Sequence, residues 1–176
     1  SIVVLPFQNM SPDPDNEYFS DGLTEEVISD LTGLSELRVI SRNSAMALKG
    51  STKNTATLAR ELGVTHLVTG SVRRAGDALR VTAELVEART DTPLWSEKFS
   101  GTVEDVFGIQ EDISKKIVSA LHVKLTEPER KQVAQRPIDD VVAYDCYLRA
   151  RREMYLWTPE AQHRALRFVD EAMDIV

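Results

Sequence analysis

Apolar residues recur along the first part of the chain with two different spacings. Residues 2–5 form an unbroken apolar run that ends at Pro6, a pattern typical of a short buried strand. From about residue 16 to residue 34, apolar side chains recur every three or four positions, which predicts an amphipathic helix. Gly33 lies near the expected end of this helix, where a left-handed cap would need glycine. The chain is therefore expected to open with a strand and a long helix.

The alternation of strands and helices continues to residue 126. Residues 37–41 predict a second strand, and residues 54–63 predict a compact helix that Asn54 or Thr55 can cap and Gly63 can end. Three further strands, joined by tight turns, are expected at residues 64–74, 79–88 and 94–99. A long helix is expected from Thr102, because Thr102 and Asp105 resemble a capping box ahead of another apolar stripe.

This order of elements narrows the topology. Two right-handed crossovers favour parallel pairing of the first three strands in one sheet, and the short turns that follow make the fourth strand antiparallel. We predict an α/β domain whose mixed five-stranded sheet has the order 2-1-3-4-5 and is sandwiched by helices.

The pattern changes after residue 126. Residues 127–140 are charged, contain Pro128 and Pro137, and are predicted to be a linker. From residue 141 onward the spacing predicts two helices, with Thr158 as the cap and Pro159 in the first turn of the second. The predicted organisation is an α/β domain at residues 1–126, a linker at 127–140 and a helical hairpin at 141–176.

An acidic stretch at residues 12–26 raises the question of a metal or catalytic site. Its acids are Asp13, Asp15, Glu17, Asp21, Glu25 and Glu26. As a calcium loop the stretch fails, because Tyr18 stands where the sharp turn needs glycine and Thr24 where a bidentate carboxylate is needed. A catalytic pair would need a buried carboxyl beside an ionised partner. These acids are expected in an exposed loop and a first helical turn, so we interpret them as the polar start of a helix.

The remaining motifs also predict no reactive group. The glycines near residues 50 and 70 do not have the spacing of a phosphate-binding loop, and His66, His122 and His163 have no partner at a metal-ligand spacing. The single cysteine, Cys146, excludes an intrachain disulfide. We therefore predict no catalytic, cofactor-binding or metal-binding residues, and no enzyme activity in this segment.

Charge and hydropathy limit the partners. A formal net charge of −7 argues against binding duplex nucleic acid, and we interpret the basic groups around Arg73, Arg74 and Arg80 and around Arg149, Arg151 and Arg152 as solvated faces. No apolar run approaches the roughly eighteen residues of a membrane span, so we expect no membrane insertion by this segment.

Three segments resemble a known family in order and spacing. They are "VVLPFQNMSPDPDNEYFSDGLTEEVISDL", "ARELGVTHLVTGSVRRAGDALRVTAELVEARTDTPLWSEKF" and "VEDVFGIQEDISKKIV". Together they resemble the TolB-like N-terminal domain of bacterial adenylate/guanylate cyclase-associated and winged-helix regulator proteins, over about residues 2–125. The resemblance implies a fold like the anticodon-binding domain of class II tRNA synthetases, a likeness of fold that does not transfer function.

Residues 141–176 resemble the first unit of a tetratricopeptide-repeat region, with Tyr147 and Ala150 on the first helix and Ala165 and Ala172 on the second. The family's Leu-Gly pair is missing, and Val169 stands where an aromatic residue is common. One repeat cannot bury both its faces, so we expect the array to continue in a longer protein. The expected interaction surface, which includes a homodimer contact through these helices, is Tyr147, Met154, Trp157, Phe168 and Met173.

The leading functional hypothesis is a non-catalytic interaction or coupling module of a multidomain bacterial signalling protein, with protein partners bound through helical repeats. One alternative is a domain of a TolB-like cell-envelope assembly or transport protein. Another is a fragment of a cyclase whose catalytic domain lies outside this chain. A fourth is a small-ligand sensor near Pro6, Phe7, Ser41 and Arg42, where parallel strands would end. The expected location is the cytoplasmic or periplasmic side of a bacterial inner-membrane protein.

Overall fold

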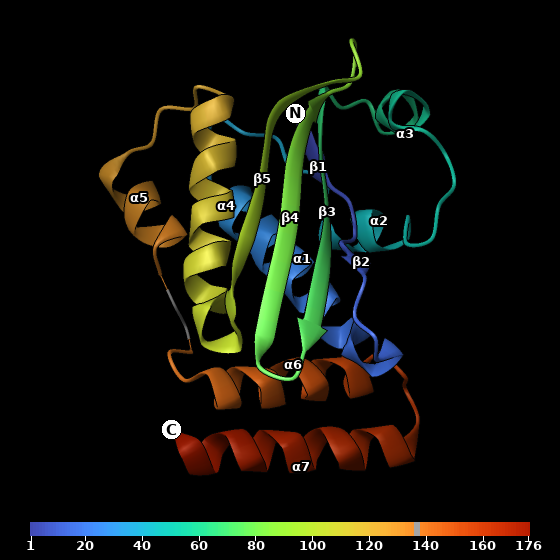
Figure 1. The fold of residues 1–176 in the computed structure, drawn as a ribbon, viewed down its shortest axis with the longest axis vertical. Coiled ribbons are helices and arrows are strands. Elements are labelled where there is room, and N and C mark those ends of the chain that lie inside the picture. The colour runs from blue at the N-terminus through green and yellow to red at the C-terminus, as the bar shows by residue number, and fades with distance from the viewer. Residues whose placement is uncertain (136–137) are drawn as a thin grey trace.

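The computed structural model describes residues 1–135 and 138–176. The strands are β1 (Ile2–Val4), β2 (Gln8–Asn9), β3 (His66–Ala75), β4 (Ala78–Glu87) and β5 (Thr92–Thr102). The α-helices are α1 (Glu17–Thr32), α2 (Arg42–Met46), α3 (Thr55–Leu62), α4 (Val106–Ala120), α5 (Glu127–Val133), α6 (Val141–Met154) and α7 (Pro159–Ile175). Two 3₁₀ turns, η1 (Pro14–Asn16) and η2 (Val103–Asp105), precede α1 and α4. The chain is therefore a mixed α/β protein, as predicted (Figure 1).

The five strands form one mixed sheet with the order β1-β3-β4-β5, and β2 pairs with β3 beyond the end of β1. β1 and β2 run parallel to β3, whereas β4 is antiparallel to both of its neighbours. The prediction of a strand at residues 37–41 is wrong: only an isolated bridge joins Val39 to Ile2. The pairing stops there because β1 is three residues long and Ser41 already caps α2, its side chain accepting from the Ser44 amide. The sequence pattern did not indicate β2.

Helices α1 and α4 pack on one face of the sheet (Figure 1). The buried residues of β4 alternate as expected, with Leu79, Val81, Ala83 and Leu85 facing the core. α4 contributes its predicted apolar stripe, which consists of Val106, Ile109, Ile113 and Ile117. The other face of β4 and β5 carries no helix in Figure 1, so the predicted covering by helices on both faces is wrong for these two strands. β3 differs, because α3 contacts it and its Leu67 is fully buried.

The predicted helix ends can be compared residue by residue. Gly63 has φ +64° and ends α3 in the left-handed region, and the Asn54 side chain accepts from the Thr57 amide, both as expected. Asp105 accepts from the Thr102 amide at 2.7 Å, which confirms the capping box. The left-handed cap at Gly33 is wrong, because its φ is −75°. The end of the exposed Gln132 side chain lies over this glycine.

The segment predicted as a linker contains a helix, α5, which fastens the α/β domain. The Glu129 carboxylate accepts from the amide and the hydroxyl of Ser35, both at 2.8 Å, and from the amide and hydroxyl of Thr126. These bonds, the Ser35 amide first, lower the pKa of Glu129 to about 2. Pro137, expected to bracket the linker, lies outside the described residues.

The two C-terminal helices form an antiparallel pair across one end of the α/β domain (Figure 1). Thr158 caps α7 by accepting from the Ala161 amide, and Pro159 lies in the first turn, as expected. Small buried residues, Ala150, Ala161 and Ala165, lie where α6 and α7 are packed closely. Within residues 1–135 and 138–176, no helix is long and apolar enough to span a bilayer.

Candidate functional site at the junction of α1 and α6

Helix α6 contacts α1 closely because one glycine leaves room. Gly22 is buried in the middle of α1, and a Cβ added there would lie 2.5 Å from Cδ2 of Leu148 on α6. Beside this contact, the ring of Tyr144 packs edge-on against Phe107 of α4, with centroids 5.0 Å apart. Both Leu148 and Tyr144 are buried, so the junction has an apolar centre.

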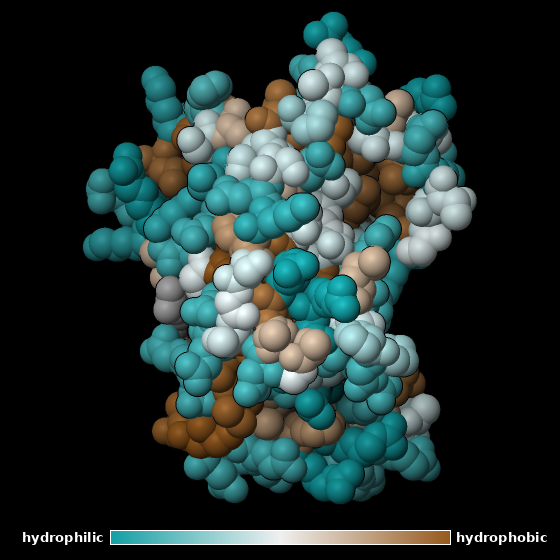
Figure 2. Space-filling view, viewed as in Figure 1, coloured by the Kyte–Doolittle hydropathy of each residue, from teal (hydrophilic) through white to brown (hydrophobic). Residues whose placement is uncertain are grey.

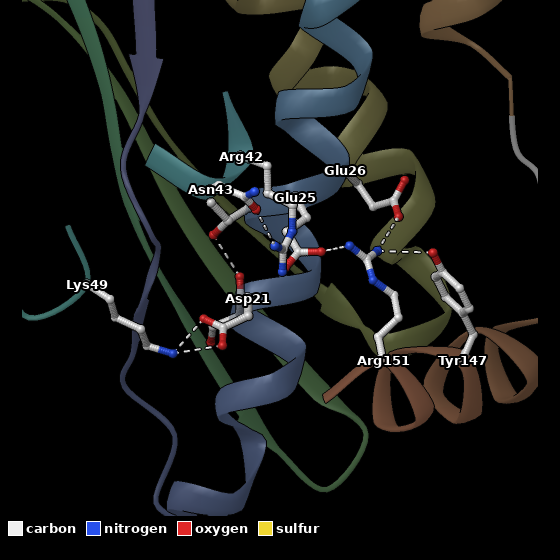
Figure 3. Close-up of polar contacts among 10 residues, drawn as sticks. Asp21, Glu25, Glu26, Arg42, Asn43, Lys49, Tyr147 and Arg151 are labelled. Atoms are coloured by element: carbon white, nitrogen blue, oxygen red, sulfur yellow. Dashed lines mark hydrogen bonds and ion pairs between the residues drawn. The ribbon is translucent and has the colours of Figure 1, made fainter. Parts of the chain in front are cut away.

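A shared carboxylate lies next to this apolar centre (Figure 3). Glu25 of α1 is only 8% exposed and forms ion pairs with both Arg42, at the start of α2, and Arg151 of α6. Arg151 also donates to the Tyr147 hydroxyl at 3.1 Å and lies 3.6 Å from the Glu26 carboxylate. A buried carboxylate is tolerated when it is paired and hydrogen-bonded, and here two separate elements supply the positive charges. The position of α6 is thereby linked to α1 and α2.

Two further contacts extend this cluster along α1. Lys49 lies 2.7 Å from both the Asp21 and the Glu17 carboxylates. Burial raises the pKa of Asp21, and the bond from Lys49 opposes that shift. Arg42 also stacks over the ring of Tyr155, 4.3 Å from its centroid, just beyond the end of α6. Lys49, which follows α2, therefore pairs with carboxylates of α1, and Tyr155, which follows α6, contacts the arginine that pairs with Glu25.

A second polar cluster joins α6 to the β3–β4 hairpin. The Asp145 carboxylate of α6 accepts from the Tyr18 hydroxyl and from Arg74 of β3, each at 2.7 Å, and from Arg149 at 2.8 Å. Burial alone would raise the pKa of Asp145, but the bonds from Tyr18 and Arg74 and the nearby arginines lower it overall. Burial and the bond to Asp145 raise the pKa of Tyr18 to about 12. α6 is thus anchored at two places. At one, the carboxylate of Glu25 comes from α1, and at the other, the carboxylate of Asp145 comes from α6 itself.

Another carboxylate of α1, that of Asp30, lies apart from these anchors. Asp30 is buried between α1 and α4 and accepts from the Ser114 hydroxyl at 2.8 Å. Burial raises its pKa to about 7, with hydrogen bonds from Ser114 and Gln110 opposing the shift and the nearby Glu26 and Glu111 adding to it.

These positions correct the interpretation of the acidic stretch. Asp13 fits it, because its side chain accepts from the Asp15 amide at the start of η1. The interpretation is wrong for Asp21, Glu25 and Glu26, which lie inside α1 and are paired or partly buried. The four-residue spacing of Asp21 and Glu25 beside the apolar stripe was a signal that these acids face other elements. Arg151, the partner of Glu25 and Glu26, is 126 positions away from Glu25, and no local pattern links the two.

The charged groups of the junction are paired with one another and hold the elements together. Its carboxylates are bound to arginine, lysine or hydroxyl donors. Among the residues that the structure describes, no group of three or more His, Cys, Asp or Glu side chains could hold a metal ion. The arrangement fixes the direction in which α6 and α7 leave the α/β domain.

The structure separates the five residues expected to form an interaction surface. Met154 and Trp157 line an open groove of about 410 Å³. Met173 is 73% exposed farther along α7. Tyr147 instead faces the junction, and Phe168 is half-buried with the Arg149 guanidinium 6.0 Å from its ring centroid.

Two residues of this surface were missed by the sequence analysis. Leu166 and Val169 also line the groove and are exposed. Their spacing with Met173, three and four positions, was a signal for one helix face. Trp157 is the most prominent member, with 80% of its surface exposed.

Fold and site together define a class: a mixed α/β domain that holds a helix pair through ion pairs. Residues 1–120 match the family model described as "HilA/YgeH-like transcriptional regulator, second domain". The chain belongs to this family.

The other comparisons concern longer proteins. The chain is 41% identical over 175 residues to "Putative adenylate cyclase 3" of Rhizobium meliloti (strain 1021). The match covers 99% of this chain but only 30% of the length of that relative. TolB from Acinetobacter baumannii has a TM-score of 0.50 and 21% identity, over 68% of this chain and 27% of that one. Lipoprotein GNA1162 from Neisseria meningitidis has a TM-score of 0.48 and 19% identity, and the match covers 71% of this chain and 98% of that one. The TolB likeness is one of fold, and the family and the relative support a signalling or regulatory module.

Proposed function

We propose that this chain is a non-catalytic coupling module of a multidomain bacterial signalling protein. In this proposal it links an output domain, either a nucleotide cyclase or a DNA-binding domain, to a helical-repeat array that binds protein partners. The regulator family and the relative named as an adenylate cyclase support the two kinds of output domain. The pair α6 and α7 is the first tetratricopeptide unit of the array, docked on an α/β domain of anticodon-binding type.

The observation that carries the proposal is the double anchoring of α6. Glu25 and Asp145 bind cations across the junction at two separate points, and Leu148 packs on Gly22 between them. A helix held at two points and packed tightly cannot rotate without leaving a charged group unpaired. A force applied to the helical array by a bound partner would therefore be transmitted to α1 and to β3.

The coupling can be tested in the full-length protein. The output is measured as cyclic-nucleotide formation for a cyclase, or as binding of promoter DNA for a regulator. Deleting the chain from residue 141 onward should change this output, and Arg151→Met should change it in the same direction because it breaks the junction. Arg164→Met is the matched control, since Arg164 pairs with Glu153 within the helix pair, at 2.7 Å. An output that ignores the deletion contradicts the proposal.

The non-catalytic part of the proposal has its own test. Purified residues 1–176 are incubated with ATP or GTP and divalent metal, and cyclic product and free phosphate are measured. We expect no turnover above a blank. Turnover that one substitution within this chain abolishes would make the segment an enzyme.

The exposed face of α6 and α7 is the proposed surface for protein partners, a second copy of the chain included. Met154, Trp157, Leu166 and Met173 expose large apolar side chains there. Sedimentation velocity tests self-association. Trp157→Glu should lower the sedimentation coefficient if this face joins two copies, and a monomeric wild type would exclude the homodimer.

The TolB likeness favours one alternative, a domain of a cell-envelope assembly or transport protein. The two functions differ in what surrounds the segment in its gene. An output domain before Ser1, followed by an apolar span, supports the signalling module, on the cytoplasmic or periplasmic side of the inner membrane. A signal peptide directly before Ser1 supports envelope assembly. Sequencing the complete reading frame separates them.

A further inference from the structure

The open face of the sheet carries a polar panel that the junction does not use. We define the outer panel as the outward-facing residues of three strands: Thr69, Ser71 and Arg73 of β3, Arg80, Thr82 and Glu84 of β4, and Ser96, Lys98 and Ser100 of β5. Figure 1 shows no helix in front of these strands, and Figure 2 shows the same face as mainly hydrophilic. These nine residues are all polar. On the same face, Leu67 and Val86 are buried beyond one end of the panel, and Ala75 and Ala78 are exposed beyond the other.

The panel gathers positive charge at one end. Arg73 is directly opposite Arg80 in the β3–β4 pairing, and both are exposed. Lys98 lies in the next row, opposite Thr82. Within residues 1–135 and 138–176, none of these three cations forms an ion pair or a side-chain hydrogen bond. The single acid of the panel, Glu84, lies between Thr69 and Ser96, two rows away from the row of Arg73 and Arg80.

This arrangement is unfavourable for the sheet by itself. Like charges that face each other directly across two strands are destabilising, and here no carboxylate is placed between them. The neighbouring Arg74 shows the contrast, because it points to the other face and is neutralised by Asp145. In a chain with a net charge of −7, a cationic patch without counter-charges indicates a partner that supplies them.

The shape of this end of the panel suits carboxylates. A shallow hollow of about 390 Å³ is lined by Arg73, Arg80 and Ser100. Guanidinium groups bind carboxylates through two parallel hydrogen bonds, and the serine hydroxyl is a further donor. Alternate side chains of an extended peptide lie roughly 6.8 Å apart, the same repeat as successive rows of the panel.

We propose that the outer panel binds an acidic polypeptide segment, rich in Asp and Glu, through Arg73, Arg80 and Lys98. A single-stranded nucleic acid fits less well. The panel has no aromatic side chain on which a base could stack, and three cations match few phosphates. This surface lies on β3 to β5, and it does not depend on the proposed role of α6.

Fluorescence anisotropy with a labelled hexaglutamate peptide tests the proposal on the complete chain. Wild-type protein should bind it saturably, and hexaglutamine should not bind. The double variant Arg73→Glu and Arg80→Glu should weaken binding by at least about tenfold, because attraction becomes repulsion. The control, Arg60→Glu with Arg89→Glu, makes the same change of net charge at two exposed arginines elsewhere and should bind as the wild type does.

Three results would overturn the proposal: no saturable binding by the wild type, equal loss in the control, or tighter binding of a thymidine hexanucleotide than of the peptide. If the charge reversal unfolds the sheet, as judged by circular dichroism, Arg73→Gln with Arg80→Gln replaces it. That variant removes the repulsion between the two arginines, and it should still lose the peptide.

Discussion

Two carboxylates on the same helix are buried to the same extent and treated differently. Glu25 and Asp30 of α1 are each 8% exposed. Glu25 is shared by Arg42 and Arg151, which come from α2 and α6. Asp30 faces Ser114 of α4 and, in the part of the chain that the structure describes, forms no ion pair.

The comparison separates two consequences of burying an acid. At Glu25 the charge is kept and is balanced by another element, so the helix becomes dependent on where that element lies. At Asp30 the charge is not balanced, so burial raises the pKa to about 7 and the carboxyl binds a proton instead. The first makes a joint between two parts of the molecule, and the second makes the α/β domain sensitive to pH.

The largest expected effect is the pH dependence due to Asp30. Its folded-state pKa of about 7 is above the ordinary value of 3.8, so between these values the folded state binds more protons than the unfolded state. The free energy of unfolding should therefore fall as the pH rises, by up to roughly 4 kcal/mol between about pH 4 and pH 7. Urea unfolding at several pH values measures this.

The variant Asp30→Asn isolates that contribution. It keeps an acceptor for Ser114 and cannot titrate. The free energy of unfolding of the variant should therefore lack the fall with rising pH that the wild type shows. Asp112→Asn, an exposed change on α4, is the matched control and should leave the slope unchanged. A wild-type curve parallel to that of Asp30→Asn would show that Asp30 titrates normally.

Glu25→Gln should destabilise the chain by about 3 kcal/mol, because Arg42 loses its carboxylate partner and Arg151 keeps only the more distant Glu26. The loss appears as a lower urea midpoint at constant slope. Glu61→Gln breaks an exposed pair with Lys53 and should change stability by about 0.5 kcal/mol or less. Equal effects of the two substitutions would mean that Glu25 does not link α1 to α2 and α6.

Gly22→Ala tests the apolar centre of the junction without changing charge. The new methyl group meets Leu148, so we expect a loss of about 1–3 kcal/mol from overpacking. Gly108→Ala on α4 meets nothing within 4 Å and should stabilise by about 1 kcal/mol through helix propensity. Thermal melts that shift in the same direction for both variants would contradict close packing at Gly22.

The smallest effect distinguishes two tyrosines. Among the residues that the structure describes, none hydrogen-bonds to the buried Tyr144 hydroxyl, so Tyr144→Phe should be neutral or stabilise by about 1 kcal/mol. The Tyr18 hydroxyl donates to Asp145, so Tyr18→Phe should destabilise by about 1–2 kcal/mol. The two variants serve as each other's control, and opposite signs are the expected result in urea unfolding.

The sequence predicted the elements whose signals are local. Period-two alternation identified β4, and caps at Asn54, Thr102 and Thr158 located the starts of helices or of the turn before one. Residues 37–41 failed as a strand, because whether an apolar run pairs depends on the length of its neighbour β1. α5 was missed although its start has a local signal, because Thr126 and Glu129 form a capping box with a proline in the first turn. Only the bonds from Ser35 to Glu129, across 94 positions, are out of reach of a local pattern.

The site was less predictable for the same reason. The acids of α1 were visible, but their burial was not, because the cations that permit it come from other elements. Of the expected surface residues, exposure at Met154 and Trp157 follows from their place at the end of α6. Tyr147 differs because its hydroxyl meets Arg151 one turn away, on the side of the helix that faces α1.

The adjacency of Arg73 and Arg74 in β3 has a consequence for how this protein can vary. The two side chains point to opposite faces, one anchoring α6 and the other belonging to the outer panel. Deleting or inserting one residue in β3 ahead of them would exchange their places. Length changes should therefore be tolerated in the β4–β5 turn around Arg89 to Asp91, whereas β3 should accept substitutions but no insertions or deletions.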